Sequence, residues 1–284
     1  MKTFFDNSKD WLYTSMFGRA VLNFAVKRAP TSKLVGRFAD SRASRKLIPR
    51  FVKDYDIDIN PETSSFVIPQ RGFRTLNELF TRSYKHEFVD FPSDHNLFGS
   101  PAEGYLSLQQ GISLDSVVQA KGFTYSLNEL VCERVPFAFE GGLLMRVRLT
   151  PKEYHHFHYF DDGRIRKFRE IPGFYYTAED LALENVPKMF CKSYRHVTKA
   201  ATDHFGSVYI IELGSNFVGS IVQTKQPYDR FKRGDEKGHF RLGGSTVILL
   251  FEKGIIELNP LIREKTQDGN EVYVSLGQEV GYKS

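Results

Sequence analysis

Short apolar runs separated by turn residues dominate the chain from about residue 98 onward, and they constrain the fold more than any other feature. Runs of this kind, bounded by Gly, Asp and Pro, are typical of β-strands joined by tight turns. We therefore predict an α+β fold in which N-terminal amphipathic helices precede a β-rich, largely antiparallel body. Its strands are expected at residues 143–149, 207–213, 218–223, 246–251, 255–258 and 271–276.

The first 90 residues have a helical pattern instead. Between residues 13 and 28 every third or fourth position is apolar, namely Tyr13, Phe17, Val21 and Phe24. Polar and basic residues recur on the opposite side. This spacing predicts an amphipathic helix that ends at Pro30. Ser/Thr-x-x-Glu capping boxes at residues 75–78 and 126–129 predict two short helices, and another is expected at residues 177–184. The chain thus divides into a helical portion, residues 1–90, and the β-rich body, residues 91–284.

The basic residues are unevenly distributed. The net charge is +5, yet the segment from Lys27 to Lys53 holds nine Lys or Arg against Asp40 alone, a charge of +8 that leaves −3 for the rest. Such a cluster beside an amphipathic helix favours binding to an anionic lipid surface. A solvated basic helical face explains it equally well. No pair of aromatic strands typical of RNA-binding modules is present, so we predict no nucleic-acid partner.

Several protein classes are excluded by composition. The chain has 284 residues, of which 41% are hydrophobic and 26% charged, as in ordinary folded proteins. Its two cysteines are too few for a disulfide framework and indicate a reducing compartment. No apolar run reaches the ~18 residues of a membrane-spanning helix, and no secretory signal is expected at the N-terminus.

A histidine cluster, YHHFH at residues 154–158, is the first candidate for chemistry, because three of the eight histidines fall within it. In a strand, His156 and His158 would share a face and could bind a metal. In a helical turn, His155 and His158 would share a face. Hydrogen-bonded surface histidines are the third interpretation.

A second candidate is the segment LGGST at residues 242–246, which leads directly into an apolar strand. Two glycines before a hydroxyl pair permit a strained backbone with an exposed carbonyl. An ordinary glycine-rich strand entry has the same pattern. Nucleotide-binding loops, the G-x-S-x-G elbow and the H-E-x-x-H motif are absent from the sequence.

Taken in order, these segments resemble the phosphatidylserine decarboxylase proenzymes, which are self-processing pyruvoyl enzymes. The resemblance covers nearly the whole chain, starting from the basic region at residues 36–55. The matching motifs are LNELFTR (76–82), SPAEG (100–104), LTPKEYHHFH (149–158), IPG (171–173), VGSI (218–221), GDEKG (234–238) and FRLGGST (240–246).

The resemblance implies that the chain cuts itself. His158, oriented by the Glu103 carboxylate, would be the general base for the Ser245 hydroxyl, which attacks the carbonyl of Gly244. The products would be chains 1–244 and 245–284, the smaller beginning with a pyruvoyl group derived from Ser245. Its carbonyl would form a Schiff base with the amine of phosphatidylserine. His155 would protonate the α-carbon after loss of CO₂, giving phosphatidylethanolamine.

The partners that the resemblance implies are phosphatidylserine in an anionic membrane surface and a second copy of the processed protomer, forming a homodimer. We expect a peripheral protein on the cytoplasmic face of the cell membrane. We assign no role to His156 and no metal ligand to any residue.

The chain departs from the family pattern at three places. Glu103 replaces the aspartate of the S-P-x-D-G motif, SYR (193–195) replaces N-E-R, and LGS (213–215) replaces V-G-A. These departures leave other interpretations open. One is a pyruvoyl decarboxylase of a soluble amino acid, another is a lipid-binding pseudoenzyme that does not process, and a third is a metalloprotein built on the histidine cluster.

Overall fold

The computed structural model describes residues 29–120, 122–176, 180–214, 221–243 and 245–284. The amphipathic helix predicted over residues 13–28 and the residue Gly244 lie outside these ranges. Pro30 falls in the first turn of a helix, α3 (Ala29–Ala39), where proline is well tolerated. Among the described residues, no helix is both long and apolar enough to cross a membrane.

Helices form most of the regular structure before residue 90. They are α3, η2 (Arg42–Leu47), α4 (Ile48–Tyr55), α5 (Leu76–Phe80) and η3 (His86–Phe88). The predicted cap of α5 is present, because the Thr75 hydroxyl accepts a hydrogen bond from the Glu78 amide at 3.0 Å. The Glu78 carboxylate accepts from the Arg74 amide, so the reciprocal half of the box is missing. At α6 (Leu127–Val131) both halves of the predicted box form, between Ser126 and Glu129.

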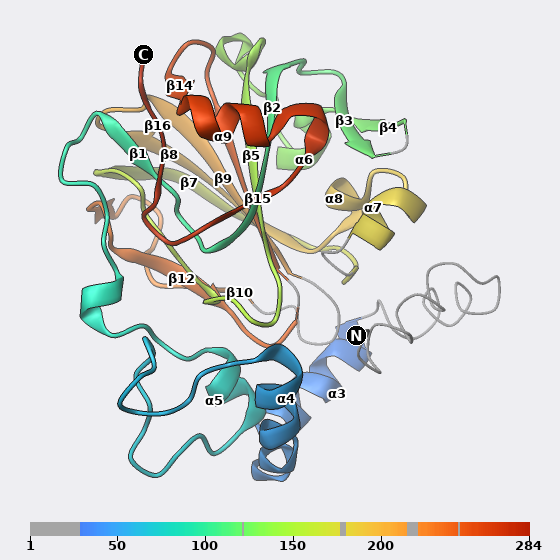
Figure 1. The fold of residues 1–284 in the computed structure, drawn as a ribbon. Helices are drawn as coiled ribbons and strands as arrows, with labels where there is room; N and C mark the ends of the chain where they lie inside the picture. The colour runs from blue at the N-terminus through green and yellow to red at the C-terminus, as the bar shows by residue number, and fades with distance from the viewer. Residues whose placement is uncertain (1–28, 121, 177–179, 215–220, 244) are drawn as a thin grey trace.

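An antiparallel sheet of eight strands forms the centre of the body (Figure 1). In spatial order its strands are β11 (Arg230–Phe231), β7 (Gly163–Ile171), β8 (Arg195–Thr202), β9 (Ser207–Gly214), β13 (Ser245–Phe251), β5 (Gly142–Leu149), β2 (Gly104–Ile112) and β15 (Val272–Val274). The predicted segments 143–149, 207–213, 246–251 and 271–276 coincide with β5, β9, β13 and β15 to within a few residues. The other two predicted segments, 218–223 and 255–258, overlap strands of smaller sheets, and residues 218–220 lie outside the described ranges. The antiparallel α+β fold is therefore confirmed.

Smaller sheets and short helices surround this centre. One sheet holds β1 (Leu97–Gly99), β16 (Glu279–Lys283) and β14 (Ile256–Leu258), another holds β10 (Ile221–Gln223), β12 (Glu236–Phe240) and β6 (His156–His158), and the third pairs β3 (Val117–Ala120) with β4 (Phe123–Tyr125). The remaining helices are η4 (Phe137–Phe139), α7 (Asp180–Asn185), α8 (Met189–Lys192), α9 (Pro260–Lys265) and η5 (Gln267–Gly269). Strands β10 and β12 lie between the large sheet and the N-terminal helices (Figure 1).

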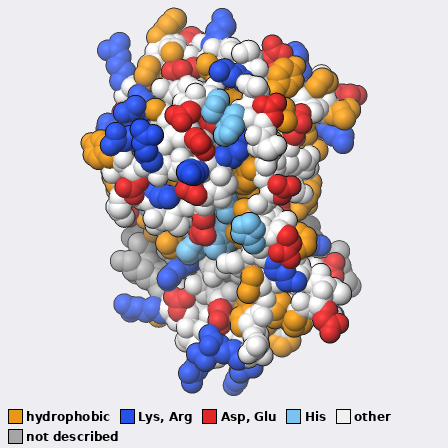
Figure 2. Space-filling view, turned by 90° about the vertical axis from the view of Figure 1, so that its left-hand side faces the viewer, with side chains coloured by type: hydrophobic (Ala, Val, Ile, Leu, Met, Phe, Trp, Pro, Cys, Tyr) orange, Lys and Arg blue, Asp and Glu red, His pale blue; other side chains and the backbone are white. Residues whose placement is uncertain are grey.

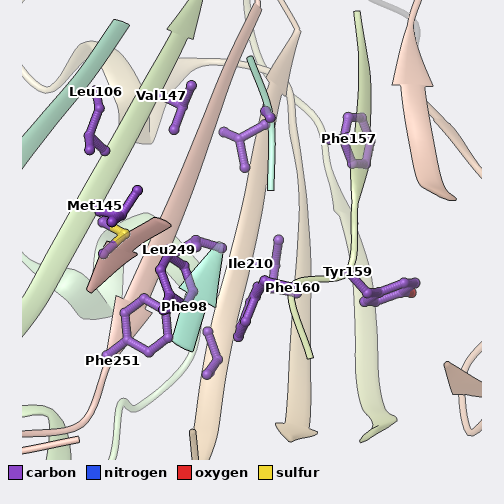
Figure 3. Close-up of a cluster of buried hydrophobic side chains, with 14 of the residues drawn as sticks. Phe98, Leu106, Met145, Val147, Phe157, Tyr159, Phe160, Ile210, Leu249 and Phe251 are labelled. Atoms are coloured by element: carbon purple, nitrogen blue, oxygen red, sulfur yellow. The ribbon is translucent and has the colours of Figure 1, made fainter. Parts of the chain in front are cut away.

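Both faces of the large sheet are buried at β13, which explains the uninterrupted apolar run from Val247 to Phe251. Leu249 and Phe251 pack into a cluster with Phe98 and Phe160 (Figure 3). The alternate residues Ile248 and Leu250 pack into a second cluster with side chains of α6, α7 and α8. Because successive strand residues point to opposite faces, a strand covered on both sides needs apolar residues at every position.

Candidate active site

The candidate residues gather at one end of the large sheet. Ser245, the first residue of β13, lies opposite Leu149 at the end of β5 and Gly214 at the end of β9. Glu103 immediately precedes β2, whose start also lies beside the end of β5. In an antiparallel sheet the end of one strand lies beside the start of its neighbour, so the end of β5 lies beside the starts of β13 and β2. The histidine segment follows β5 in the chain and therefore starts from this same end of the sheet. This end of the sheet faces β10, β12 and the N-terminal helices (Figure 1).

Ser245 is 1% exposed, and its hydroxyl lies 3.4 Å from the carbonyl oxygen of Gly243, to which it donates. Gly243 has a φ of 143°, a value that side-chain-bearing residues rarely adopt. The expectation of an unusual glycine backbone before the hydroxyl is therefore confirmed at Gly243. The buried serine hydroxyl lies against the main chain that precedes it.

The N-terminal helices hold the segment that leads to Ser245. The amide of Leu242 donates to Oδ1 of Asn77 on α5 at 3.0 Å, and Nδ2 of Asn77 donates to Asp40 at 2.8 Å. The Leu242 side chain packs on an apolar cluster that includes Ile48 and Leu79. Sequence reasoning missed Asn77, although it lies in the LNELFTR motif. A polar residue on the buried side of a short helix was the available signal.

The His158 side chain is a neutral imidazole with a hydrogen-bond partner at each ring nitrogen. It lies in strand β6, so the strand interpretation of the cluster is confirmed and His156 shares its face. Its Nδ1 lies 2.8 Å from the Gly234 carbonyl, which can only accept, so the proton is on Nδ1. Nε2 then accepts from the Tyr154 hydroxyl at 3.3 Å. Burial lowers the pKa of His158 below its ordinary value of 6.5, so Nε2 is unprotonated at neutral pH.

The Glu103 carboxylate is bound by two tyrosines. Its oxygens accept from the hydroxyls of Tyr84 and of Tyr273, the second at 2.6 Å. No hydrogen bond of the described residues joins Glu103 to His158. The ring centroids of Tyr84 and Tyr154 lie 4.3 Å apart with the ring planes tilted by 37°, so two packed tyrosines lie between the carboxylate and the imidazole. The Gly234 carbonyl orients His158 here, and the role of Glu103 as its orienting group stays a prediction.

The close approach of two strands explains why a glycine, Gly104, follows Glu103. Its φ is 150°, and a Cβ there would lie 2.4 Å from the backbone oxygen of Arg148 on the neighbouring strand. A larger residue would force β2 away from β5 at the point where the Glu103 carboxylate enters the site.

His155 is fully buried and has one free ring nitrogen. Its Nδ1 donates to the Glu153 carbonyl at 2.9 Å, and its ring lies 3.8 Å from that of Phe80. Nε2 has no hydrogen-bond partner among the described residues. Burial, assisted by the Arg82 charge, lowers the pKa of His155 well below 6.5. The ring is therefore a neutral proton acceptor whose protonated form would be a strong acid.

Residues 76–282 match the family model described as phosphatidylserine decarboxylase. The chain belongs to the phosphatidylserine decarboxylase family. It is 39% identical over 275 residues to a phosphatidylserine decarboxylase proenzyme of Clostridium perfringens (strain SM101 / Type A), covering 96% of this chain and 92% of the relative. A proenzyme of the same name from Clostridium novyi (strain NT) is 38% identical over 280 residues, covering 98% and 93%. Another, from Ruminiclostridium cellulolyticum (strain ATCC 35319 / DSM 5812 / JCM 6584 / H10), is 39% identical over 271 residues, covering 95% and 89%.

This membership confirms the predicted resemblance. Phosphatidylserine decarboxylases are carboxy-lyases, so the expectation of a decarboxylating carbon–carbon lyase is confirmed as well. The family model covers Glu103, the histidine segment and Ser245 together with Asn77. The individual roles of these residues rest on the chemistry of the site.

Removal of the Asn77 side chain tests how the segment before Ser245 is held. Asn77→Ala deletes the acceptor of the Leu242 amide, and misplacement of reacting groups by ~1 Å can cost about 100-fold in rate. We expect self-cleavage of the chain to slow by about 10-fold or more. Mass spectrometry of the fragments over time measures the rate. Asn128→Ala is the matched control, because Asn128 accepts from the Val135 amide at 2.7 Å in a different part of the chain. Equal cleavage rates of the two variants would contradict this role of Asn77.

The buried histidines predict loss of stability in mild acid. Burial lowers the pKa of His155 and His158, and that of His196 to about 4. The unfolded chain takes up these protons near pH 6.5 and the folded chain at lower pH, so the free energy of unfolding falls as pH drops from about 6.5 towards about 4. Each such proton contributes a slope of about 1.4 kcal/mol per pH unit within that window. Urea unfolding at several pH values measures it, and His196→Asn should reduce the slope. A profile that is flat below pH 6.5 would show that these histidines are protonated in the folded chain.

Proposed function

We propose that this chain is a self-processing decarboxylase that converts phosphatidylserine to phosphatidylethanolamine and CO₂ with a pyruvoyl group made from Ser245. The observation that carries the proposal is the buried Ser245 hydroxyl against a glycine backbone, at the end of the sheet from which the histidine segment starts. Family membership supports the same reaction.

Self-processing begins with the Ser245 hydroxyl. Its oxygen attacks the Gly244 carbonyl, and Nε2 of His158 takes the proton. The peptide C–N bond breaks as its nitrogen is protonated, which leaves Gly244 joined to the Ser245 side chain as an ester. Loss of the α-proton of residue 245 expels the Gly244 carboxylate and leaves dehydroalanine. Its imine form takes up water and loses ammonia, so that chain 245–284 begins with a pyruvoyl group.

The residues fit such a group. Ser245 is 1% exposed, which would shield a carbonyl at this position from bulk water, and β13 is fixed between β5 and β9. The pyruvoyl group supplies a carbonyl that binds the amine of the substrate and draws electrons from the bond to its carboxylate. We assign His155 to proton transfer at the α-carbon, because its Nε2 has no other partner among the described residues.

The surface of the N-terminal helices supports access to a phospholipid. Exposed apolar side chains, Leu34 (68%), Phe38 (45%) and Leu47 (40%), lie in the same segment as exposed basic ones, and we call this the basic–apolar surface; its basic residues are Arg37, Arg42, Arg45 and Lys46. Figure 2 shows Lys and Arg side chains at the lower end of the molecule, the level of α3 and α4 in Figure 1. Apolar residues among cations suit the interface of an anionic bilayer.

Hydrogen bonds connect this surface to the site. Asn77 donates to Asp40, which follows α3, and accepts from the Leu242 amide in the segment before Ser245. We propose that the protein binds as a peripheral protein to the cytoplasmic face of the cell membrane and functions as a homodimer of processed protomers. The mass of the processed protein in solution tests the dimer.

Ser245→Ala tests the central proposal. The parental protein, analysed by mass under denaturing conditions, should appear as chains 1–244 and 245–284, the smaller blocked to Edman sequencing. The variant should stay a single chain without decarboxylase activity, because nucleophile and cofactor precursor are the same residue. Decarboxylation by the variant would overturn the pyruvoyl mechanism. An uncut parental chain would instead indicate a pseudoenzyme.

The two histidines should act at different stages. His158→Ala removes the base and should block cutting of the chain. His155→Ala should still cut but release CO₂ about 100-fold more slowly or worse, the usual contribution of a positioned acid or base. Fragment masses and CO₂ release from the same preparations separate these effects. Normal cutting by both variants would show that neither histidine is the base.

Charge reversal tests the basic–apolar surface. Arg45→Glu/Lys46→Glu should weaken binding to phosphatidylserine-containing vesicles by at least about 30-fold, since each lost basic residue contributes about 1 kcal/mol and the new carboxylates are repelled by the anionic surface. The matched control is Arg263→Glu/Lys265→Glu on α9, at the other end of the molecule in Figure 1. Co-sedimentation at low and high salt measures the difference. Equal losses in both variants would contradict a specific membrane-facing surface.

A further inference from the structure

A second group of ionisable side chains lies where β6 pairs with β12. His156 on β6 is directly opposite His239 on β12, and Glu236 precedes His239 by three residues. Residues three apart in a regular strand point to opposite faces. The register of β12 shifts between Glu236 and Gly238, and this irregularity brings Glu236 and His239 to the same side.

Three potential ligand atoms converge there. Nδ1 of His156 lies 3.0 Å from Oε1 of Glu236, and Nδ1 of His239 lies 3.3 Å from the same oxygen. All three atoms lie within 4.8 Å of one another. Tetrahedral Zn²⁺ with bonds of about 2.0–2.1 Å separates its ligand atoms by about 3.3 Å. The three side chains are therefore close to the spacing that such an ion requires.

The protonation of His156 leaves a lone pair aimed at this point. Its Nε2 lies 3.1 Å from the carbonyl oxygen of Thr81, which can only accept, so the proton of the neutral ring is on Nε2. Nδ1 forms no hydrogen bond with any described residue, although the side chain is only 6% exposed. A lone pair facing a carboxylate in a buried place is repulsive unless a proton or a metal cation lies between them. A histidine that donates its other N–H to a backbone carbonyl is also typical of metal ligands.

The second histidine group of the molecule lacks this feature. Figure 2 shows two groups of histidine side chains near carboxylates on one face. In the group of His95, Asp161 and His204, the Asp161 oxygens accept from the amide and ring of His204, both at 2.8 Å, and Arg233 lies 3.6 Å away. The protein thus supplies its own cation there. The Glu236 carboxylate likewise accepts from the His239 ring at 3.3 Å, but no described Lys or Arg forms an ion pair with it.

We propose that His156, Glu236 and His239 bind a divalent transition-metal ion of the zinc class, which joins β6 to β12. Two nitrogens and one carboxylate oxygen suit Zn²⁺ and leave a fourth position for water. Glu236 is 35% exposed and lines a groove of about 750 Å³, which gives the ion a path from solvent. The ion would fix the strand on which His158 lies two residues further along.

This assignment differs from the histidine pair considered from the sequence. His158 does not belong to this group of converging ligand atoms: its Nδ1 donates to the Gly234 carbonyl and its Nε2 lies 3.3 Å from the Tyr154 hydroxyl. The partner of His156 is His239, 83 positions away in the sequence and directly across the sheet.

Zinc binding to the full chain after treatment with EDTA tests the proposal without reference to catalysis. Calorimetry and elemental analysis after dialysis should give one Zn²⁺ per chain, and Zn²⁺ should raise the melting temperature. Glu236→Gln and His239→Gln should each weaken binding at least 10-fold and abolish the zinc-dependent rise. His95→Gln, which alters the other histidine group, should bind as the parent does.

Circular dichroism and the zinc-free melting temperature establish that each variant is folded. The two ligand substitutions are made at partly exposed positions for this reason, and His156 is left intact. A parental chain that binds no zinc, or equal affinity in Glu236→Gln and parent, would overturn the proposal. Loss of binding in His95→Gln alone would place the ion at the other group and overturn it equally.

Discussion

Strand β13 forms hydrogen-bonded ladders with β5 on one side and with β9 on the other, and the position of Ser245 depends on both. A shift of register by one residue would turn every side chain of β13 to the opposite face. Such a shift is costly because the side chains of Val247, Leu249 and Phe251 fit one core cluster and those of Ile248 and Leu250 fit the other. The packing of the apolar side chains of β13 thus fixes the Ser245 hydroxyl at the end of the sheet.

A buried ion pair connects this sheet to the strands that carry the histidines. Nζ of Lys237 on β12 lies 2.8 Å from Oε1 of Glu212 on β9, and both side chains are at most 1% exposed. Gln223 on β10 hydrogen-bonds to both partners. Burial lowers the pKa of Lys237 and raises that of Glu212, and their mutual attraction opposes both shifts. Loss of one partner would leave a buried charge, at a cost of about 3–5 kcal/mol, so the pair fixes the small sheet against the large one.

Local sequence patterns were sufficient for some of the elements. The capping box at Ser126 and the strand at residues 246–251 follow from neighbouring residues, and the structure agrees. The histidine segment was compatible with a strand or a helical turn, and only the structure shows that it is a strand. The ordered motifs were sufficient for the family. The two tyrosines that bind Glu103 were not predictable in this way. Tyr84 and Tyr273 donate to its carboxylate, because a side chain at the start of β2 meets the residues that the fold brings there. The role of Glu103 in orienting His158, which the family resemblance implies, stays a prediction.

The sequence by itself therefore determined the α+β class, several of the strand and short-helix segments and the family, and through the family motifs it named the candidate residues Glu103, His155, His158 and Ser245. Only the tertiary structure decided which groups each residue meets. Asn77 reaches Leu242 across 165 positions, His156 lies opposite His239 in the pairing of β6 with β12, and an irregularity in β12 brings Glu236 to the same side. The physical reason is that turn and periodicity signals act over a few residues, whereas hydrogen bonds between distant elements depend on strand register and packing. Those are properties of the assembled core.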